Sequence, residues 1–155
     1  MAKATASITI RTSPEKSSKP INYRAIDFNI GGRRVQIAGM ASPSSKEQDP
    51  KAVMNFLKGQ GYTMLISLDE HINHAKIAEA AGITYVNQNV KDFTAPSIEQ
   101  LEHIYALIKD CVARGGKPVI HCMEGFGRTG TVLAAIKLKE LQATTPLVEW
   151  SEQVK

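Results

Sequence analysis

Short apolar segments alternate with longer amphipathic ones through most of this chain, and this alternation is the strongest constraint on its fold. The pattern predicts strands at residues 63–68, 83–88 and 118–122, and helices that begin near residues 50, 73, 98 and 128. Strands that alternate with helices are typical of a parallel sheet covered on both faces. We therefore expect a single α/β domain with a mostly parallel central sheet flanked by helices.

Two more apolar segments, residues 24–30 and 33–39, precede this alternating part of the chain. Gly31 and Gly32 join them, and glycine accepts the positive φ angles that tight hairpin turns require. We therefore expect an N-terminal β-hairpin.

Sequence signals also mark where two of the helices begin. Asp49 precedes Pro50, as expected for a helix cap followed by proline in the first turn, and Ser97 with Gln100 forms a capping box. The helix after Ser97 carries an apolar stripe at helical spacing, which we expect to be buried. The stripe consists of Ile98, Leu101, Ile104, Tyr105, Ile108, Cys111 and Val112.

The composition indicates one ordinary globular domain behind a polar tail. Residues 1–20 are rich in Ser, Thr, Lys and Pro, so we expect them to be disordered and residues 21–155 to form the domain. The tail carries +3 of the net charge of +4, which argues against a nucleic-acid surface on the domain. No apolar run is long enough for a membrane span, and two cysteines make no disulfide framework. We expect a cytoplasmic monomer.

Three loops should meet at one edge of the sheet, because ligands of such sheets bind beyond the carboxyl ends of the strands. These loops follow Leu68, Gln88 and Cys122. The third loop has the sequence HCMEGFGRTG (residues 121–130) and runs into a helix, whose N-terminus attracts anions. We interpret it as a phosphate cradle and use that name for residues 121–130.

The composition of the cradle suits a tetrahedral dianion. Gly125 and Gly127 allow the backbone to curl so that successive amides point inward, and the planar Arg128 guanidinium matches two phosphate oxygens. The residues expected to surround the phosphate are Met123, Glu124, Gly125, Phe126, Gly127 and Arg128. We expect the Glu124 side chain to point to solvent at the rim.

Cys122 lies at the base of the same positive site, which favours its thiolate form. A thiolate that faces a bound phosphoryl group can attack it and form a phosphocysteine. Thr129 could donate a hydrogen bond to the sulfur when it leaves again, and His121 could orient the loop through its ring N–H. Cys111 lies on the apolar stripe, and a disulfide between it and Cys122 is a less favoured alternative.

The leaving alcohol needs a proton from an acid on another loop. Asp92, in the loop of residues 89–96 (the acid loop), is our first choice, and Asp69 after the neighbouring strand is the second. The cradle also matches the dinucleotide pattern GxGxxG from Gly125 to Gly130, but only 25 residues follow and no second βαβ unit fits within them. We therefore reject a nucleotide-binding oxidoreductase.

The His121-Cys122-x5-Arg128-Thr129 sequence resembles the signature of cysteine-dependent protein tyrosine phosphatases, and most closely that of the small atypical dual-specificity phosphatases. The resemblance covers roughly residues 33–140 and includes Asp92-Phe93 with Pro96 in the acid loop. It implies that Cys122 is the nucleophile, Arg128 the phosphate-binding residue and Asp92 the general acid, and that Thr129 assists phosphoryl release, with no metal or cofactor. The family continues through further helices, so this domain is expected to be minimal or truncated at its C-terminal end.

The resemblance implies a phosphorylated protein as substrate, with phosphotyrosine and also phosphoserine or phosphothreonine as targets. Phe93 and Phe126 would wall a shallow pocket. Phosphoinositide phosphatases of this type carry lysines in the loop, where this chain has Met123, Glu124 and Phe126. Two alternatives remain open at this point: a phosphate-binding module with little turnover, and a phosphatase that acts on a phosphoinositide or an RNA 5′-triphosphate.

Overall fold

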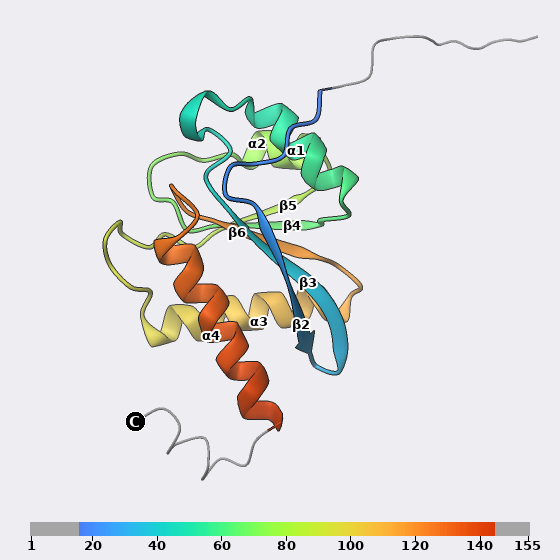
Figure 1. Cartoon of the computed structure of the whole chain (residues 1–155), viewed down its shortest axis with the longest axis vertical. Helices are drawn as coiled ribbons and strands as arrows, with labels where there is room; N and C mark the ends of the chain where they lie inside the picture. Colours follow the sequence, from blue (N-terminus) through green and yellow to red (C-terminus); the bar gives the residue numbers. More distant parts are fainter. Residues whose placement is uncertain (1–15, 145–155) are drawn as a thin grey trace, which may run out of the picture.

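The computed structural model describes residues 16–144, in which a five-stranded sheet lies between helices (Figure 1). Most of the tail expected to be disordered, residues 1–15, lies outside this range, as do residues 145–155. The strands are ordered β2-β3-β6-β4-β5 across the sheet. Their bounds are Arg24–Ile30 (β2), Arg33–Met40 (β3), Met64–Ser67 (β4), Thr84–Asn87 (β5) and Pro118–His121 (β6).

Three of the four strand pairings are parallel, as the alternating sequence predicted. β6 lies between β3 and β4 and is parallel to both, and β5 is parallel to β4. The exception is the N-terminal hairpin, in which β2 pairs antiparallel with β3. Gly31 and Gly32 form its turn with φ angles of +57° and +84°, so the expected hairpin is confirmed.

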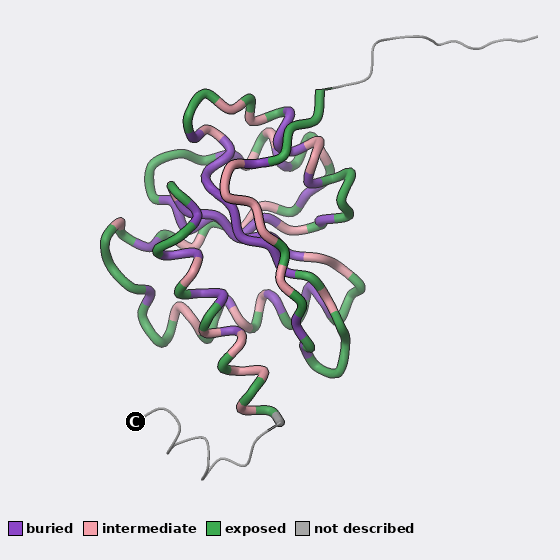
Figure 2. Tube along the Cα trace, in the orientation of Figure 1, coloured by how far each residue is buried: buried purple, intermediate pink, exposed green. Residues whose placement is uncertain are grey.

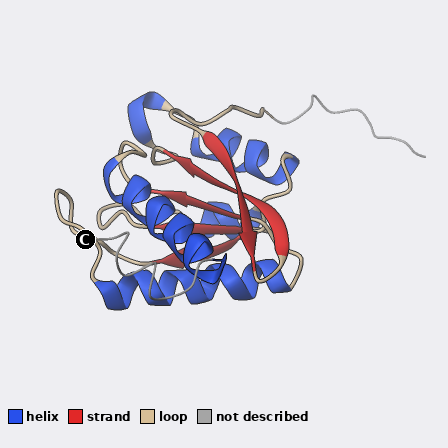
Figure 3. Ribbon diagram, turned by 60° about the horizontal axis from the view of Figure 1, so that its bottom comes forward, coloured by secondary structure: helices blue, strands red, loops and turns tan. Residues whose placement is uncertain are grey.

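The helices cover both faces of the sheet (Figure 3). α1 and α2 lie on one face, and α3 and α4 lie on the other (Figure 1). Their bounds are Pro50–Gly59 (α1), Ala75–Ala80 (α2), Ile98–Ala113 (α3) and Gly127–Thr144 (α4), and a single 3-10 turn, Ser45–Glu47 (η2), occurs in the loop before α1. None of the helices within residues 16–144 is long and apolar enough to cross a membrane.

The central strands alternate between two hydrophobic cores, one under each helical layer. In β6, Val119 packs with the residues of α1 and α2, whereas Ile120 packs with those of α3 and α4. Leu65 and Ile66 divide in the same way in β4. The centre of the sheet is therefore buried on both sides (Figure 2), which fixes the positions of the loops at the strand ends.

The expected helix caps are present. The Asp49 carboxylate accepts a hydrogen bond from the Lys51 amide at 3.0 Å, and both bonds of the Ser97–Gln100 capping box are formed. Of the predicted stripe of α3, Ile104, Ile108, Cys111 and Val112 are buried, and Leu101 and Tyr105 are half-buried against the same core. The expectation for Ile98 is wrong, because its side chain is 79% exposed. Ile98 is the first residue of α3, and its side chain points back beyond the turns that contact the sheet.

Candidate active site

The three loops expected at one edge of the sheet meet on the side chain of Arg128. This arginine lies in the first turn of α4, and its side chain is buried. Its Nη1 donates to the carbonyl oxygen of Leu68, just after β4, at 3.3 Å, and to that of Val90, after β5, at 2.8 Å. The guanidinium therefore joins the cradle to both neighbouring loops, and the three loops meet at one edge of the sheet as predicted.

Two hydrogen bonds hold successive carbonyl groups of the cradle away from its centre. The His121 Nδ1 lies 3.0 Å from the carbonyl oxygen of Cys122, and the Ser42 amide donates to the carbonyl oxygen of Met123 at 2.9 Å. In a trans peptide the following N–H points opposite to the carbonyl. The amides of Met123 and Glu124 are therefore oriented to the other side, as an anion nest requires.

The two glycines expected to shape the cradle are not equivalent. Gly125 has a φ of +89°, and an added Cβ would lie 2.5 Å from the carbonyl carbon of Met40. The cradle thus packs directly against the end of β3, where a side chain has no room. Gly127 begins α4 with open space around its α-carbon, so packing does not require glycine there.

Cys122 is placed to face a ligand in the cradle. Its side chain is 2% exposed, and its Sγ accepts a hydrogen bond from the Gly125 amide at 3.3 Å. A cavity of 540 Å³ reaches it, lined by residues 92–95 of the acid loop and by cradle residues that include Arg128 and Phe126.

Of the two candidate acids, Asp92 lies at this cavity. Its Oδ1 is 3.3 Å from Nη2 of Arg128 and also accepts the Phe93 amide at 3.0 Å. Asp69, by contrast, is fully buried outside the cavity lining, and its Oδ1 accepts the His71 amide at 3.0 Å. The structure therefore brings Asp92, and not Asp69, to the cradle.

The remaining predicted residues occupy the rim and the interior of the cradle. Glu124 is exposed at the rim, as expected. Phe126 lines the cavity and lies under the Arg24 guanidinium, 5.6 Å from the ring centroid. Thr129 is buried, and its hydroxyl has no hydrogen-bond partner within residues 16–144. The bond expected from Thr129 to the sulfur is therefore not formed in this structure, where the threonine methyl group lies close to Gly39.

A buried polar cluster behind the cradle was not predicted. His121, His74 and Asp69 are all buried, and the two histidine rings are 5.8 Å apart, edge to face. Burial lowers the pKa of His121 to about 4 and also lowers that of His74, despite the opposing effect of the Asp69 carboxylate. His121 is therefore neutral near pH 7, and its Nδ1 carries the proton that it donates to the Cys122 carbonyl.

This burial predicts a stability that falls in acid. The unfolded chain binds a proton at His121 below about pH 6.5, whereas the folded chain does so only near pH 4. The free energy of unfolding should therefore fall as the pH falls from 6.5 to 4, by about 3 kcal/mol from this group. Urea unfolding across this range would measure it. His121→Asn should flatten the profile, and the exposed His71→Asn should not; equal slopes in all three proteins would contradict the assignment.

Cys111 lies too far from Cys122 for a disulfide. It is buried near the start of β6, with its Sγ 3.7 Å from the Thr63 hydroxyl and close to Gly116. Cys122 follows the opposite end of that strand. Gly116 and Cys122 are six positions apart along a segment that includes β6, a separation on the order of 20 Å, and disulfides need Cα atoms within about 7 Å. The structure thus excludes this alternative without a large rearrangement.

Comparisons with known proteins agree with this geometry. The family described as "Polymorphic toxin system, DSP-PTPase phosphatase" matches residues 38–142. The tyrosine-protein phosphatase CDC14 of Saccharomyces cerevisiae is 30% identical over 97 residues, which are 62% of this chain and 18% of that protein. The human dual specificity protein phosphatase CDC14A is 26% identical over 133 residues, which are 80% of this chain and 22% of that protein. The chain spans about a fifth of the length of these relatives.

Solved structures show the same fold. Tk-PTP in its active form superposes with a TM-score of 0.56 at 28% identity, covering 76% of this chain and 75% of the other. A protein tyrosine phosphatase from Leishmania major superposes with a TM-score of 0.65 at 17% identity, covering 86% and 87%. Since the family match includes the cradle, the acid loop and the strands that carry them, this chain belongs to the DSP-PTPase phosphatase family of polymorphic toxin systems.

Proposed function

We propose that this domain hydrolyses phosphate monoesters on proteins, on phosphotyrosine and also on phosphoserine or phosphothreonine, through a phosphocysteine intermediate. The observation that carries the proposal is that the Cys122 thiol, the Arg128 guanidinium and the Asp92 carboxylate line one cavity. A nucleophile, an anion-binding group and a proton donor are the three components that this reaction needs.

The phosphate is held by the cradle. Inward-facing amides of Met123, Glu124 and Gly125 and the helix N-terminus bind its oxygens. The Arg128 fork binds two of them, because its Nη1 is already fixed by the Leu68 and Val90 carbonyls and the group cannot swing away. A dianion at the guanidinium displaces the Asp92 carboxylate, which is then free to hold a proton for the leaving oxygen.

The reaction proceeds in two displacements. The Cys122 thiolate attacks phosphorus, the ester O–P bond breaks, and Asp92 donates its proton to the leaving oxygen. Asp92 then accepts a proton from water, which attacks phosphorus, and the S–P bond breaks to give inorganic phosphate and the thiolate. The Thr129 hydroxyl donates to the leaving sulfur; it is buried and has no competing partner within the described residues.

The shape of the cavity supports protein substrates. Phe93 in the acid loop is 99% exposed, and its φ of +63° is unusual for a bulky residue. Together with Phe126 it provides apolar walls for the side chain that carries the phosphate. The exposed rim carries Glu124 and no lysine within the cradle, an arrangement that disfavours polyphosphorylated inositols.

A simple assay tests the proposal. The protein should release p-nitrophenol from p-nitrophenyl phosphate in the presence of EDTA, and vanadate should inhibit this release competitively. A panel of phosphopeptides, phosphoinositides and RNA 5′-triphosphate then identifies the substrate class. Phosphate binding without turnover of any of these substrates would instead indicate a binding module.

Replacing the proposed acid should separate binding from catalysis. Asp92→Asn cannot donate a proton, so kcat for a phosphotyrosine peptide should fall by roughly 10²–10³-fold, while the affinity for inorganic phosphate should not weaken. Asp69→Asn tests the alternative acid, and its kcat, measured on the fraction that remains folded, should stay close to wild type. The opposite pattern would transfer the role of acid to Asp69.

A further inference from the structure

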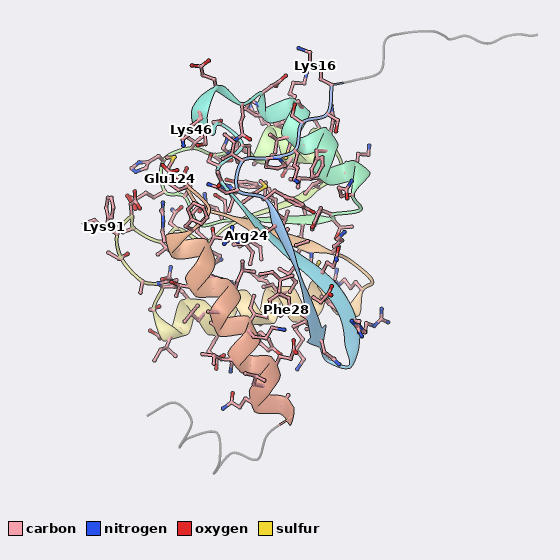
Figure 4. The ribbon with its side chains drawn as sticks, viewed as in Figure 1. Lys16, Arg24, Phe28, Lys46, Lys91 and Glu124 are labelled. Atoms are coloured by element: carbon pink, nitrogen blue, oxygen red, sulfur yellow. The ribbon has the colours of Figure 1, made fainter. Side chains whose placement is uncertain are left out.

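A third hydrogen bond to a carbonyl group of the cradle comes from outside the region that the family match covers. The Asn22 Nδ2 donates a hydrogen bond of 2.7 Å to the carbonyl oxygen of Glu124. Asn22 lies just before β2, whereas the family match begins at residue 38. Glu124 and Arg24, both labelled in Figure 4, mark the two segments that this bond joins.

This bond orients the peptide group whose N–H donates to the sulfur of Cys122. The carbonyl of Glu124 and the N–H of Gly125 belong to one peptide group, which is trans. When Asn22 holds the carbonyl outward, the N–H is directed the opposite way. That N–H is the group that donates to the Cys122 sulfur at 3.3 Å.

The three hydrogen bonds hold the carbonyl groups of three consecutive peptides of the cradle. His121 holds the carbonyl of Cys122, Ser42 holds that of Met123, and Asn22 holds that of Glu124. The first two come from the cradle itself and from the end of the adjacent strand β3. The third comes from a residue 102 positions away in the sequence. An anion nest needs all of its amides oriented together.

The segment around Asn22 is built to keep this side chain in place. Asn22 has a φ of +58°, a conformation that asparagine tolerates better than most residues. The carbonyl oxygen of Ile21 accepts the Ala41 amide at 2.9 Å, and the Asn22 carbonyl accepts Nη1 of Arg24 at 3.1 Å. The same Arg24 lies over the Phe126 ring at the cavity wall. This segment therefore contacts the cradle at two points.

We infer that Asn22 is a positioning residue, which orients the Glu124–Gly125 peptide so that its N–H faces the sulfur and the bound phosphate. The inference rests on the proposed function, because it assumes that the cradle binds the transferring phosphoryl group. It extends the functional unit to a residue before the family match, so residues 38–142 alone form an incomplete cradle.

Two substitutions distinguish the loss of the whole Asn22 side chain from the loss of its hydrogen-bond donor. Asn22→Gly removes the side chain and keeps the positive φ, and Asn22→Asp keeps the shape but places an acceptor against the Glu124 carbonyl. Loss of one oriented amide costs up to about 10²–10³-fold. Because water can replace part of the bond at this exposed site, we expect kcat/KM to fall about 10-fold in Asn22→Gly and further in Asn22→Asp.

Vanadate binding, measured by calorimetry, distinguishes positioning from a loss of folded protein. Misfolding of a fraction of the molecules lowers the number of sites but leaves the Kd of the remainder unchanged. Misorientation of the amide raises the Kd by about the factor lost in kcat/KM, because vanadate occupies the site of the transition state. Asn55→Ala is the matched control, since it removes a 2.9 Å side-chain bond to the Lys16 carbonyl, away from the cradle.

Each outcome is informative. A raised Kd in both Asn22 variants but not in Asn55→Ala supports the inference, even if the wild-type protein binds vanadate without turning over substrate, in which case only the proposed function fails. A wild-type Kd in both Asn22 variants overturns the inference. A wild-type protein that does not bind vanadate overturns both.

Discussion

Replacing Cys122 with serine should lower kcat for p-nitrophenyl phosphate by about 10⁴-fold or more, in the range seen when a nucleophile is removed. A serine hydroxyl would have to lose its proton first, and the site offers no base for it. In the proposed mechanism Asp92 serves the leaving oxygen, and the His121 Nδ1 is already bound to the Cys122 carbonyl. The cradle amides and Arg128 stay in place, so the affinity for inorganic phosphate should remain close to wild type.

Steady-state kinetics and calorimetry measure these two effects separately. Cys111→Ser is the control, because Cys111 lies at the opposite end of β6 and should leave kcat unchanged. Substantial turnover by the Cys122→Ser protein would mean that water attacks phosphorus directly, and the two-displacement scheme would have to be abandoned.

The second large effect concerns Arg128. Arg128→Lys keeps the positive charge but loses the planar fork, and a single ammonium group cannot bind two phosphate oxygens while also donating to the Leu68 and Val90 carbonyls. We expect kcat/KM to fall by about 10³-fold, the magnitude associated with losing a major transition-state donor. The affinity for phosphate should weaken as well, in contrast to the result for Cys122→Ser.

The control for Arg128 is Arg114→Lys, at an exposed arginine that pairs with Asp110 at 3.1 Å. It should leave both activity and phosphate binding unchanged. The melting temperature of Arg128→Lys must be measured too, because two buried carbonyls lose their donor. If the folded Arg128→Lys protein retained near wild-type kcat/KM, charge alone would suffice and the fork would have no role.

The sequence was enough to predict the sheet and its covering helices, because the signals concerned are local. Glycine pairs mark the hairpin, the Ser97–Gln100 capping box marks the start of α3, and runs of apolar residues mark the parallel strands. The misplaced Ile98 shows the limit of this method. Periodicity identifies the apolar face of a helix, but it does not tell which turns of that face reach the sheet.

The cradle could also be predicted, since Cys122, Gly125 and Arg128 lie within seven consecutive residues. One contact that orients it, from the ring N–H of His121, was also predicted. The others could not be predicted, because they come from distant segments and mostly use backbone atoms. Nothing in the sequence near Ser42, Leu68 or Val90 indicates that their amide or carbonyl groups hold the cradle or its arginine. The burial of His74 was missed for a similar reason: it depends on packing against His121, which is 47 positions away.

The central claim, transfer of the phosphoryl group to Cys122, is tested most directly by trapping the intermediate. The Asp92→Asn protein is the best choice, because p-nitrophenolate leaves without protonation whereas hydrolysis of the phosphocysteine still needs the base. Acid quenching after mixing with p-nitrophenyl phosphate, followed by peptide mass spectrometry, should show one phosphoryl group on Cys122, formed with a burst equal to the enzyme concentration. A phosphoryl group on another residue, or turnover with neither burst nor adduct, would contradict the account.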